Sequence, residues 1–140
     1  MKFLLDANAC IQLLRPGCGE SIRKRIDESG ADGIALCSVV RTELLFGALR
    51  SRQREHNLAQ VRLLLGQFPS LPFDDAAGEH AADIRAALAA RGAPIGPADV
   101  LIAAIARANG FVLVTHNVAE FSRVAGLHVD DWQGDPGPRR

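Results

Sequence analysis

The chain has 140 residues, a length that fits one compact domain. Apolar residues make up 48% of it and charged residues 23%, which excludes a disordered chain, a collagen-like chain and a coiled coil. Sixteen basic residues balance 16 acidic ones, so net charge does not argue for nucleic acid or an anionic membrane. Any contact with RNA must therefore come from a local basic patch.

Cysteine usage and apolar run length limit the compartment and the class of site. Cys10, Cys18 and Cys37 form no CxxC pair, which argues against a disulfide framework and against a zinc site. The apolar runs are far too short to span a membrane, and Asp6 interrupts the N-terminal run before the core of a signal peptide could form. We expect a soluble, cytoplasmic protein without membrane contact.

In the first half of the chain, short apolar runs alternate with helical spacing. The runs at 3–5 and 33–37 are apolar throughout, which predicts strands. Stop signals at Pro16 and Gly30 end the helical patterns between them. In chain order, we predict a strand over 3–5, helices over 9–14 and 21–28, a strand over 33–37, a helix over 39–49 capped by Ser38, and a helix over 54–67.

The second half continues the alternation. Pro72 favours an edge position for a short strand, Asp74 or Asp75 caps an Ala-rich helix, and Pro97 opens the next helix. In chain order, we predict a strand over 71–73, helices from 75 to 91 and from 97 to 109, a strand over 111–115 and a weak strand over 127–129. Residues 1–133 then form the domain, and 134–140 form a flexible C-terminal tail.

Strands that are apolar throughout are buried on both faces, and their alternation with helices predicts an α/β fold. We expect a single domain with a short, mostly parallel sheet of about five strands and helices on both faces. Ligands of such sheets bind beyond the carboxyl ends of the strands. The residues that follow each strand are therefore the first candidates for a functional site.

Four polar residues stand at or near those positions. Asp6 follows the first strand, Glu43 and Asp99 lie in the first two turns of helices, and Asn117 comes two residues after the strand over 111–115. Carboxylates that converge on one cleft repel one another, so a cation must join them if they are to stay ionised together. Oxygen ligands suit Mg²⁺ or Mn²⁺, which polarise a phosphoryl oxygen and supply a hydroxide for attack.

Each of these residues also has a purely structural interpretation. Asp6 alone is equally well explained as a helix cap, and Asn117 alone as a turn residue. Glu43 alone is typical of a solvated helix face, and Asp99 alone of a residue that complements the helix dipole. The spacing by itself therefore suggests a metal site without establishing one.

The order of the motifs resembles that of the PIN-domain ribonucleases. The segments LLDAN (4–8), SVVRTEL (38–44), GPADVLIAA (96–104) and LVTHN (113–117) carry this resemblance, which covers nearly the full chain. The whole order looks like the VapC toxins of bacterial type II toxin–antitoxin modules. The phrase over 85–97 and the ending over 120–132 look closest to the branch that cuts initiator tRNA.

This resemblance implies a Mg²⁺- or Mn²⁺-dependent endoribonuclease that cleaves tRNA in the anticodon loop. Asp6, Glu43 and Asp99 match the three acidic metal ligands of the family, and Asn117 falls where members carry Asp or Asn. Ala7 departs from the usual Asp-Thr-Asn motif and removes a hydroxyl from the site.

The resemblance also implies partners: a VapB-type antitoxin, operator DNA reached only through that antitoxin, and a second copy in a homodimer. Residues 44–46 and 54–65 offer more apolar surface than a small domain readily covers. We expect this surface to form a groove for an antitoxin segment, from which a basic group reaches the acidic pocket.

Four further residues are candidates for RNA contact. Arg50, Arg52 and Arg54 form the densest basic cluster, which is either a solvated loop or a rail for RNA phosphates. His116 stands where this branch often carries another polar residue, and it is either an exposed turn histidine or a phosphate contact.

Other enzyme classes that gather carboxylates at strand ends fit less well. A haloacid-type phosphatase needs a second Asp at position 8, where the chain has Asn8. A receiver domain needs a lysine after a late strand, but the chain has only Lys2 and Lys24. A non-catalytic PIN-fold binding module that acts through its antitoxin or RNA partner remains the alternative.

Overall fold

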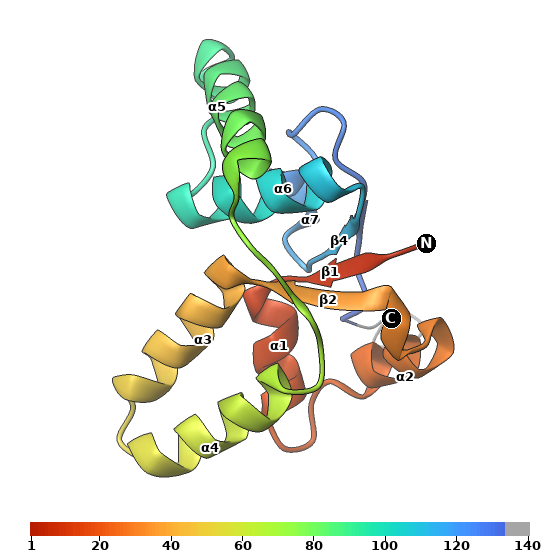
Figure 1. Cartoon of the computed structure of the whole chain (residues 1–140), viewed down its shortest axis with the longest axis vertical. Coiled ribbons are helices and arrows are strands. Elements are labelled where there is room, and N and C mark those ends of the chain that lie inside the picture. The colour runs from red at the N-terminus through yellow and green to blue at the C-terminus, as the bar shows by residue number, and fades with distance from the viewer. Residues whose placement is uncertain (134–140) are drawn as a thin grey trace, which may run out of the picture.

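A five-stranded parallel sheet lies at the centre of the structure (Figure 1). The computed structural model describes residues 1–133, so the expected tail at 134–140 lies outside the described residues. The strand order is β3-β2-β1-β4-β5, and every neighbouring pair is parallel. The strands are β1 (Phe3–Leu5), β2 (Ile34–Cys37), β3 (Ser70–Leu71), β4 (Val112–Val114) and β5 (Val129–Asp130).

Helices cover both sides of the sheet, as the alternating sequence pattern predicts. In Figure 1, α5 and α6 lie on one side of the strands, whereas α1, α3 and α4 lie on the other. The helices are α1 (Ala7–Leu14), α2 (Glu20–Ser29), α3 (Ser38–Leu49), α4 (Arg54–Leu65), α5 (Asp75–Ala90), α6 (Pro97–Asn109) and α7 (Val118–Phe121), and a 3-10 turn spans Ala31–Gly33. None of the helices described is long and apolar enough to cross a membrane.

The central strands are buried on both faces, which explains their unbroken apolar character. All four residues of β2 are buried, and so are Leu4 and Leu5 of β1. Because β1 pairs with both β2 and β4, the backbone after β1 enters the middle of the sheet's carboxyl edge. The expected α/β class and parallel sheet are confirmed.

Several element boundaries differ from the sequence-based predictions. Cys37, not Ser38, is the N-cap residue of α3, because β2 runs directly into the helix without an intervening residue. Ser38 is the first helical residue instead, and its hydroxyl donates to the Leu71 carbonyl at 3.4 Å. Strand β3 is an edge strand as predicted, but it ends before Pro72. Strand β5 begins two residues later than predicted, and α7 was not predicted at all.

Trp132 anchors the segment that follows β5. Its side chain is 2% exposed, its ring centroid lies 4.7 Å from that of Phe3, and its indole N–H donates to Asp130 Oδ2 at 3.0 Å. Its carbonyl accepts a 2.8 Å hydrogen bond from the Ser21 hydroxyl of α2. The backbone from 130 to 132 is therefore held against β1 and α2.

Candidate active site

A pocket of about 300 Å³ lies at the carboxyl edge of the sheet. It brings together the four residues that the sequence singles out, although they come from different parts of the chain. The lining consists of Asp6, Ala7, Asn8, Ile11, Glu43, Asp99, Ile102, Asn117 and Phe121. We call this the acidic pocket.

Asp6 is both a helix cap and a lining residue. It follows β1 directly, is only 6% exposed, and accepts a 2.8 Å hydrogen bond from the Ala9 N–H in the first turn of α1. Burial raises the pKa of this carboxyl, and hydrogen bonds from the Thr115 side chain and the Ala9 N–H partly oppose that rise. The two sequence-based interpretations of Asp6 are therefore compatible.

Glu43 and Asp99 face the pocket from α3 and α6. Asp99 is the third residue of α6, and its carboxylate folds back over the N-cap, where a Cβ at Gly96 would lie 3.2 Å from Asp99 Oδ2. Burial, followed by the charges of Asp99 and Asp6, raises the pKa of Glu43. Burial, followed by the charges of Glu120 and Asp6, raises the pKa of Asp99. The charge of Asp6 thus destabilises the ionised forms of both Glu43 and Asp99.

Thr115 is a site component that the sequence reasoning passed over. It is 1% exposed, and its hydroxyl oxygen accepts a 3.0 Å hydrogen bond from the Asn117 N–H. The same side chain lies close enough to Asp6 to lower the pKa of that carboxyl. Only the strand pairing reveals it: with Leu5 opposite Val114, the next residues of the two strands, Asp6 and Thr115, are neighbours. A buried hydroxyl thereby links the Asp6 carboxylate to the backbone that carries Asn117.

Glu120 is the second component that was missed. It lies in α7, and its negative charge is the largest charge contribution to the raised pKa of Asp99. The four-residue helix is too short to give a periodic pattern, so nothing in the sequence indicated which way this side chain points. The pocket therefore has a fourth carboxylate within electrostatic reach.

The oxygen ligands of the pocket suit Mg²⁺, although they do not surround an ion completely. Within residues 1–133, no three His, Cys, Asp or Glu side chains are arranged to hold an ion by themselves. Mg²⁺ keeps several waters and usually takes one or two carboxylates together with substrate phosphates, so it does not need such a cage. Asp6, Glu43 and Asp99 offer only oxygen ligands, which suit such an ion. The ion would also relieve the repulsion among their negative charges.

The basic candidates lie elsewhere. Arg50, Arg52 and Arg54 are exposed at the turn between α3 and α4, and none of them lines the acidic pocket. The Arg50 guanidinium lies 5.4 Å from the centroid of the Phe46 ring. His116 is exposed beside the pocket, and its Nδ1 lies 3.0 Å from Asp131 Oδ2.

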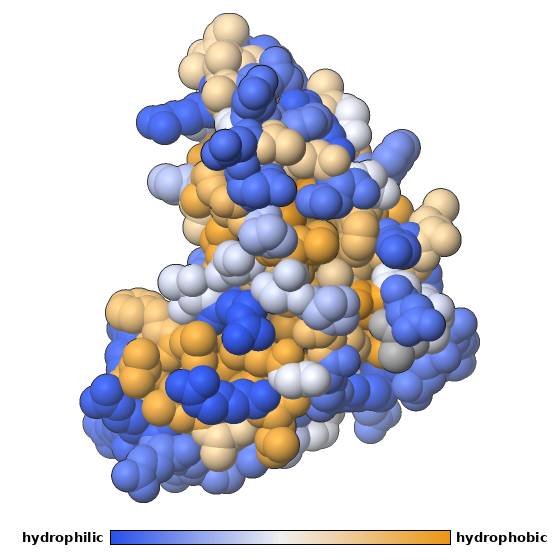
Figure 2. Space-filling view, in the orientation of Figure 1, coloured by the Kyte–Doolittle hydropathy of each residue, from blue (hydrophilic) through white to orange (hydrophobic). Residues whose placement is uncertain are grey.

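A groove of about 600 Å³ runs between α1, α3 and α4. Leu44, Ala48 and Val61 form its apolar floor, while Phe46 and Leu63 are 59% and 65% exposed on the same two helices. We call residues 38–65 the α3–α4 arm. Figure 2 shows that apolar surface gathers over this arm. The expected apolar surface is therefore present.

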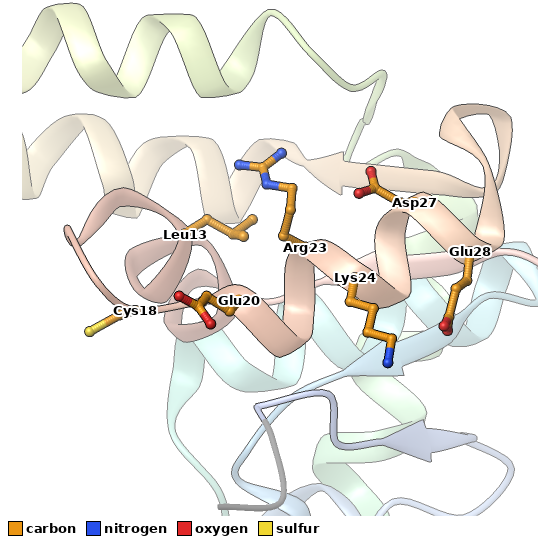
Figure 3. A pocket seen from close by; sticks show the side chains of 8 residues that line it. Leu13, Cys18, Glu20, Arg23, Lys24, Asp27 and Glu28 are labelled. Atoms are coloured by element: carbon orange, nitrogen blue, oxygen red, sulfur yellow. The ribbon is translucent and has the colours of Figure 1, made fainter.

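A further pocket, of about 570 Å³, lies along α2 and has a different character. Figure 3 shows Arg23 and Asp27 pointing to one side of α2 and Lys24 and Glu28 to the other. Opposite charges four residues apart are typical of a solvated helix face. These side chains do not converge on a common point, so this pocket does not resemble the acidic one.

Comparisons with known proteins agree with this geometry. The PIN domain matches residues 3–127 of the chain. Two relatives named "tRNA(fMet)-specific endonuclease VapC", from Shigella flexneri and Salmonella typhimurium, are 39% and 38% identical to the chain. Each alignment covers 94% of this chain and 98% of the relative.

Solved structures give the same result. The crystal structure of DNA-bound VapBC from Salmonella typhimurium is similar with a TM-score of 0.89 at 38% identity, over 94% of this chain and 98% of that chain. The structure of VapBC2 from Rickettsia felis, bound to a DNA fragment from its promoter, is similar with a TM-score of 0.88 at 28% identity. The alignment covers 94% of this chain and 99% of that chain.

Proposed function

Because the chain belongs to the PIN-domain family and within it to the VapC ribonucleases, we propose that it is the toxin of a type II toxin–antitoxin module. Its activity is the metal-dependent endonucleolytic cleavage of RNA. The observation that carries this proposal is the convergence of Asp6, Glu43 and Asp99 on one pocket at the carboxyl edge of a parallel sheet.

Asp6, Asp99 and Glu43 are the residues that would hold Mg²⁺ or Mn²⁺. When bound, such an ion polarises the scissile phosphate and supplies a hydroxide from coordinated water. Asp6 accepts the Ala9 N–H, so its carboxylate is oriented before substrate arrives. Asn117 presents a neutral amide to the same pocket, where it contacts substrate or ordered water without adding repulsion.

The proposed substrate is initiator tRNA, cut in its anticodon loop. Support comes from the relatives, two of which are named for tRNA(fMet). A loop suits the geometry, because unstacked nucleotides reach a small pocket that a duplex does not enter.

Cleavage of total tRNA by the purified protein, with Mg²⁺ or with EDTA, tests this function when the new 5′ ends are mapped. We expect one dominant cut in the initiator tRNA anticodon loop, present with Mg²⁺ and absent with EDTA. Cuts confined to messenger or ribosomal RNA would overturn the proposed tRNA substrate but would still support the nuclease activity. RNA binding without cleavage in any divalent metal would favour the alternative, a non-catalytic binding module.

The proposed partner is a VapB-type antitoxin. The groove between α1, α3 and α4 offers an apolar floor for an amphipathic segment, and its lining residue Ile11 also lines the acidic pocket. A segment seated in the groove is therefore adjacent to the carboxylates. A basic side chain at its end would be attracted into the pocket, where it competes with the metal ion for the same oxygens.

Three further expectations belong to this proposal. Operator DNA is reached only through the antitoxin, in keeping with the DNA-bound VapBC complexes among the similar structures. A homodimer and a cytoplasmic location stay predictions, the latter because the substrate and the antitoxin are made there. Light scattering of the purified toxin measures the dimer directly, and a mass near that of one chain would exclude it.

A further inference from the structure

We propose that His116 binds a phosphate of the RNA substrate next to the scissile bond, and that Asp131 is the positioning residue that orients its ring. This inference rests on the proposed ribonuclease function and adds a substrate contact to the acidic pocket. The two residues follow β4 and β5, at the same edge of the sheet as Asp6.

The pair has a defined geometry. His116 Nδ1 lies 3.0 Å from Asp131 Oδ2, which directs the Nδ1 proton to the carboxylate and leaves Nε2 as the free ring nitrogen. The His116 side chain is 59% exposed and that of Asp131 is 37% exposed, so Nε2 is accessible to a large ligand. The ring therefore presents one nitrogen to the protein and one to the surroundings.

Asp131 is itself fixed from several directions. Its Oδ1 accepts a 2.9 Å hydrogen bond from the Gln133 N–H, and its own N–H donates to Asp130 Oδ1 at 2.9 Å. Asp130 is held in turn, because its Oδ2 accepts from the Trp132 indole at 3.0 Å and from Arg25 at 3.3 Å. The orientation of His116 is thus connected to the buried Trp132 and not to a loose loop.

The charge distribution around the pocket indicates an anionic ligand for His116. None of the nine residues that line the acidic pocket is basic, so the lining itself offers a phosphate nothing but repulsion and neutral groups. His116 and Asp131 both lie within electrostatic reach of Asp6: the charge of Asp131 raises the pKa of Asp6, and the positive charge of His116 lowers it by less. An RNA strand that places one phosphate in the pocket needs a donor for a neighbouring phosphate. The doubly protonated His116 ring keeps its Nδ1–H on Asp131 and offers a second N–H, at Nε2, to that phosphate.

Kinetics and binding with initiator tRNA test this assignment through four variants. His116→Phe removes both ring nitrogens, His116→Gln keeps a side-chain N–H donor, and Asp131→Asn removes only the orienting charge. The double variant combines His116→Phe with Asp131→Asn. His128→Phe is the matched control, because His128 is also exposed but precedes β5, at the opposite edge of the sheet.

Loss of a hydrogen bond to a charged group predicts a KM about tenfold higher for His116→Phe, with kcat within about twofold of wild type. Binding of the same tRNA in EDTA should weaken by the same factor, which reports the contact without cleavage. His116→Gln should recover most of the loss, and Asp131→Asn should cost about threefold. The double variant should be no worse than His116→Phe, because Asp131 acts through the ring.

His116→Phe and His128→Phe with the same KM and the same tRNA affinity would overturn the proposal. So would a fall in kcat alone, additive losses from the two single changes, or weaker inhibition by the antitoxin with RNA binding unchanged. Failure of the wild-type protein to cleave or bind tRNA would instead overturn the proposed function itself.

Discussion

The acidic pocket and the α3–α4 arm both depart from the most stable arrangement of their residues, but in opposite ways. The pocket concentrates ionised groups around the 6%-exposed Asp6, where their charges repel. The arm instead leaves large apolar side chains, Phe46 and Leu63, in water. A cation relieves the first departure and an apolar segment relieves the second, so each region indicates its own kind of ligand.

The largest expected effect comes from removing a charge in the pocket. Asp6→Asn and Asp99→Asn should each lower the rate of tRNA cleavage by at least about a thousandfold, because the metal loses an anionic ligand. Asn at position 6 still caps α1, so the thermal midpoint should stay the same or rise.

The matched control is Asp75→Asn, which changes an exposed acidic residue in the first turn of α5, as Asp99 lies in the first turn of α6. Its cleavage rate should equal that of the wild type. Wild-type rates for both pocket variants would remove the catalytic assignment of these carboxylates.

The second prediction concerns the groove of the arm. Gly47 lines the groove, and a Cβ added there meets no atom within 4 Å, so Gly47→Glu places a charge in the groove without disturbing the fold. We expect antitoxin affinity to fall about a hundredfold and tRNA cleavage to be unchanged, since a buried charge at an interface is unpaired.

Gly47→Ala is the control for this change, because it adds only a methyl group and raises helix propensity. Calorimetric titration with a purified antitoxin peptide measures the antitoxin affinity of both variants. Equal affinities for Gly47→Glu and Gly47→Ala would mean that the antitoxin binds elsewhere.

The third prediction concerns the basic end of the same arm. If Arg50, Arg52 and Arg54 contact RNA phosphates, their joint replacement by Ala should weaken tRNA binding by about tenfold and reduce its salt dependence. The slope of log affinity against log salt should fall by about one unit per lost contact. An unchanged slope would mean that these arginines belong to a solvated loop and do not contact RNA.

The smallest effect is a pH dependence of stability. The folded carboxyl groups of the pocket have pKa values above their ordinary 3.8 for Asp and 4.5 for Glu, so above those values the folded state binds more protons than the unfolded state. The stability of the metal-free protein should therefore fall as the pH rises above this range.

Thermal melts at pH 5 and pH 7 in EDTA test this dependence. The midpoint should be higher at pH 5 than at pH 7, because the raised pKa values let the folded state keep protons that the unfolded state has lost. Asp99→Asn should reduce the difference. A midpoint difference that Asp99→Asn leaves unchanged would place the titrating groups outside the pocket.

Sequence reasoning found the parts of the molecule that have strong local signals. Unbroken apolar runs predicted β1, β2 and β4. The cap Asp74 predicted the start of α5, and Pro97, favoured at the first helical position, predicted the start of α6. Asp6, Glu43, Asp99 and Asn117 were selected by their place after strands and early in helices, and all four line one pocket.

The site residues that the sequence did not indicate are brought into place by contacts between distant segments. Thr115 touches Asp6 only because β4 pairs with β1, and Asp131 meets His116 only because β5 pairs with β4. Glu120 lies on a helix too short to show a period. Side-chain direction at such positions is set by sheet order, which composition and spacing do not encode.

Direct binding of Mn²⁺ tests the central claim, that the pocket carboxylates hold the catalytic metal. An electron paramagnetic resonance titration of the wild-type protein, Asp99→Asn and the Asp75→Asn control measures free Mn²⁺ without any need for cleavage. The account predicts that the wild-type protein and Asp75→Asn bind with equal affinity and that Asp99→Asn binds at least about tenfold more weakly. Equal Mn²⁺ affinity in all three proteins would contradict it.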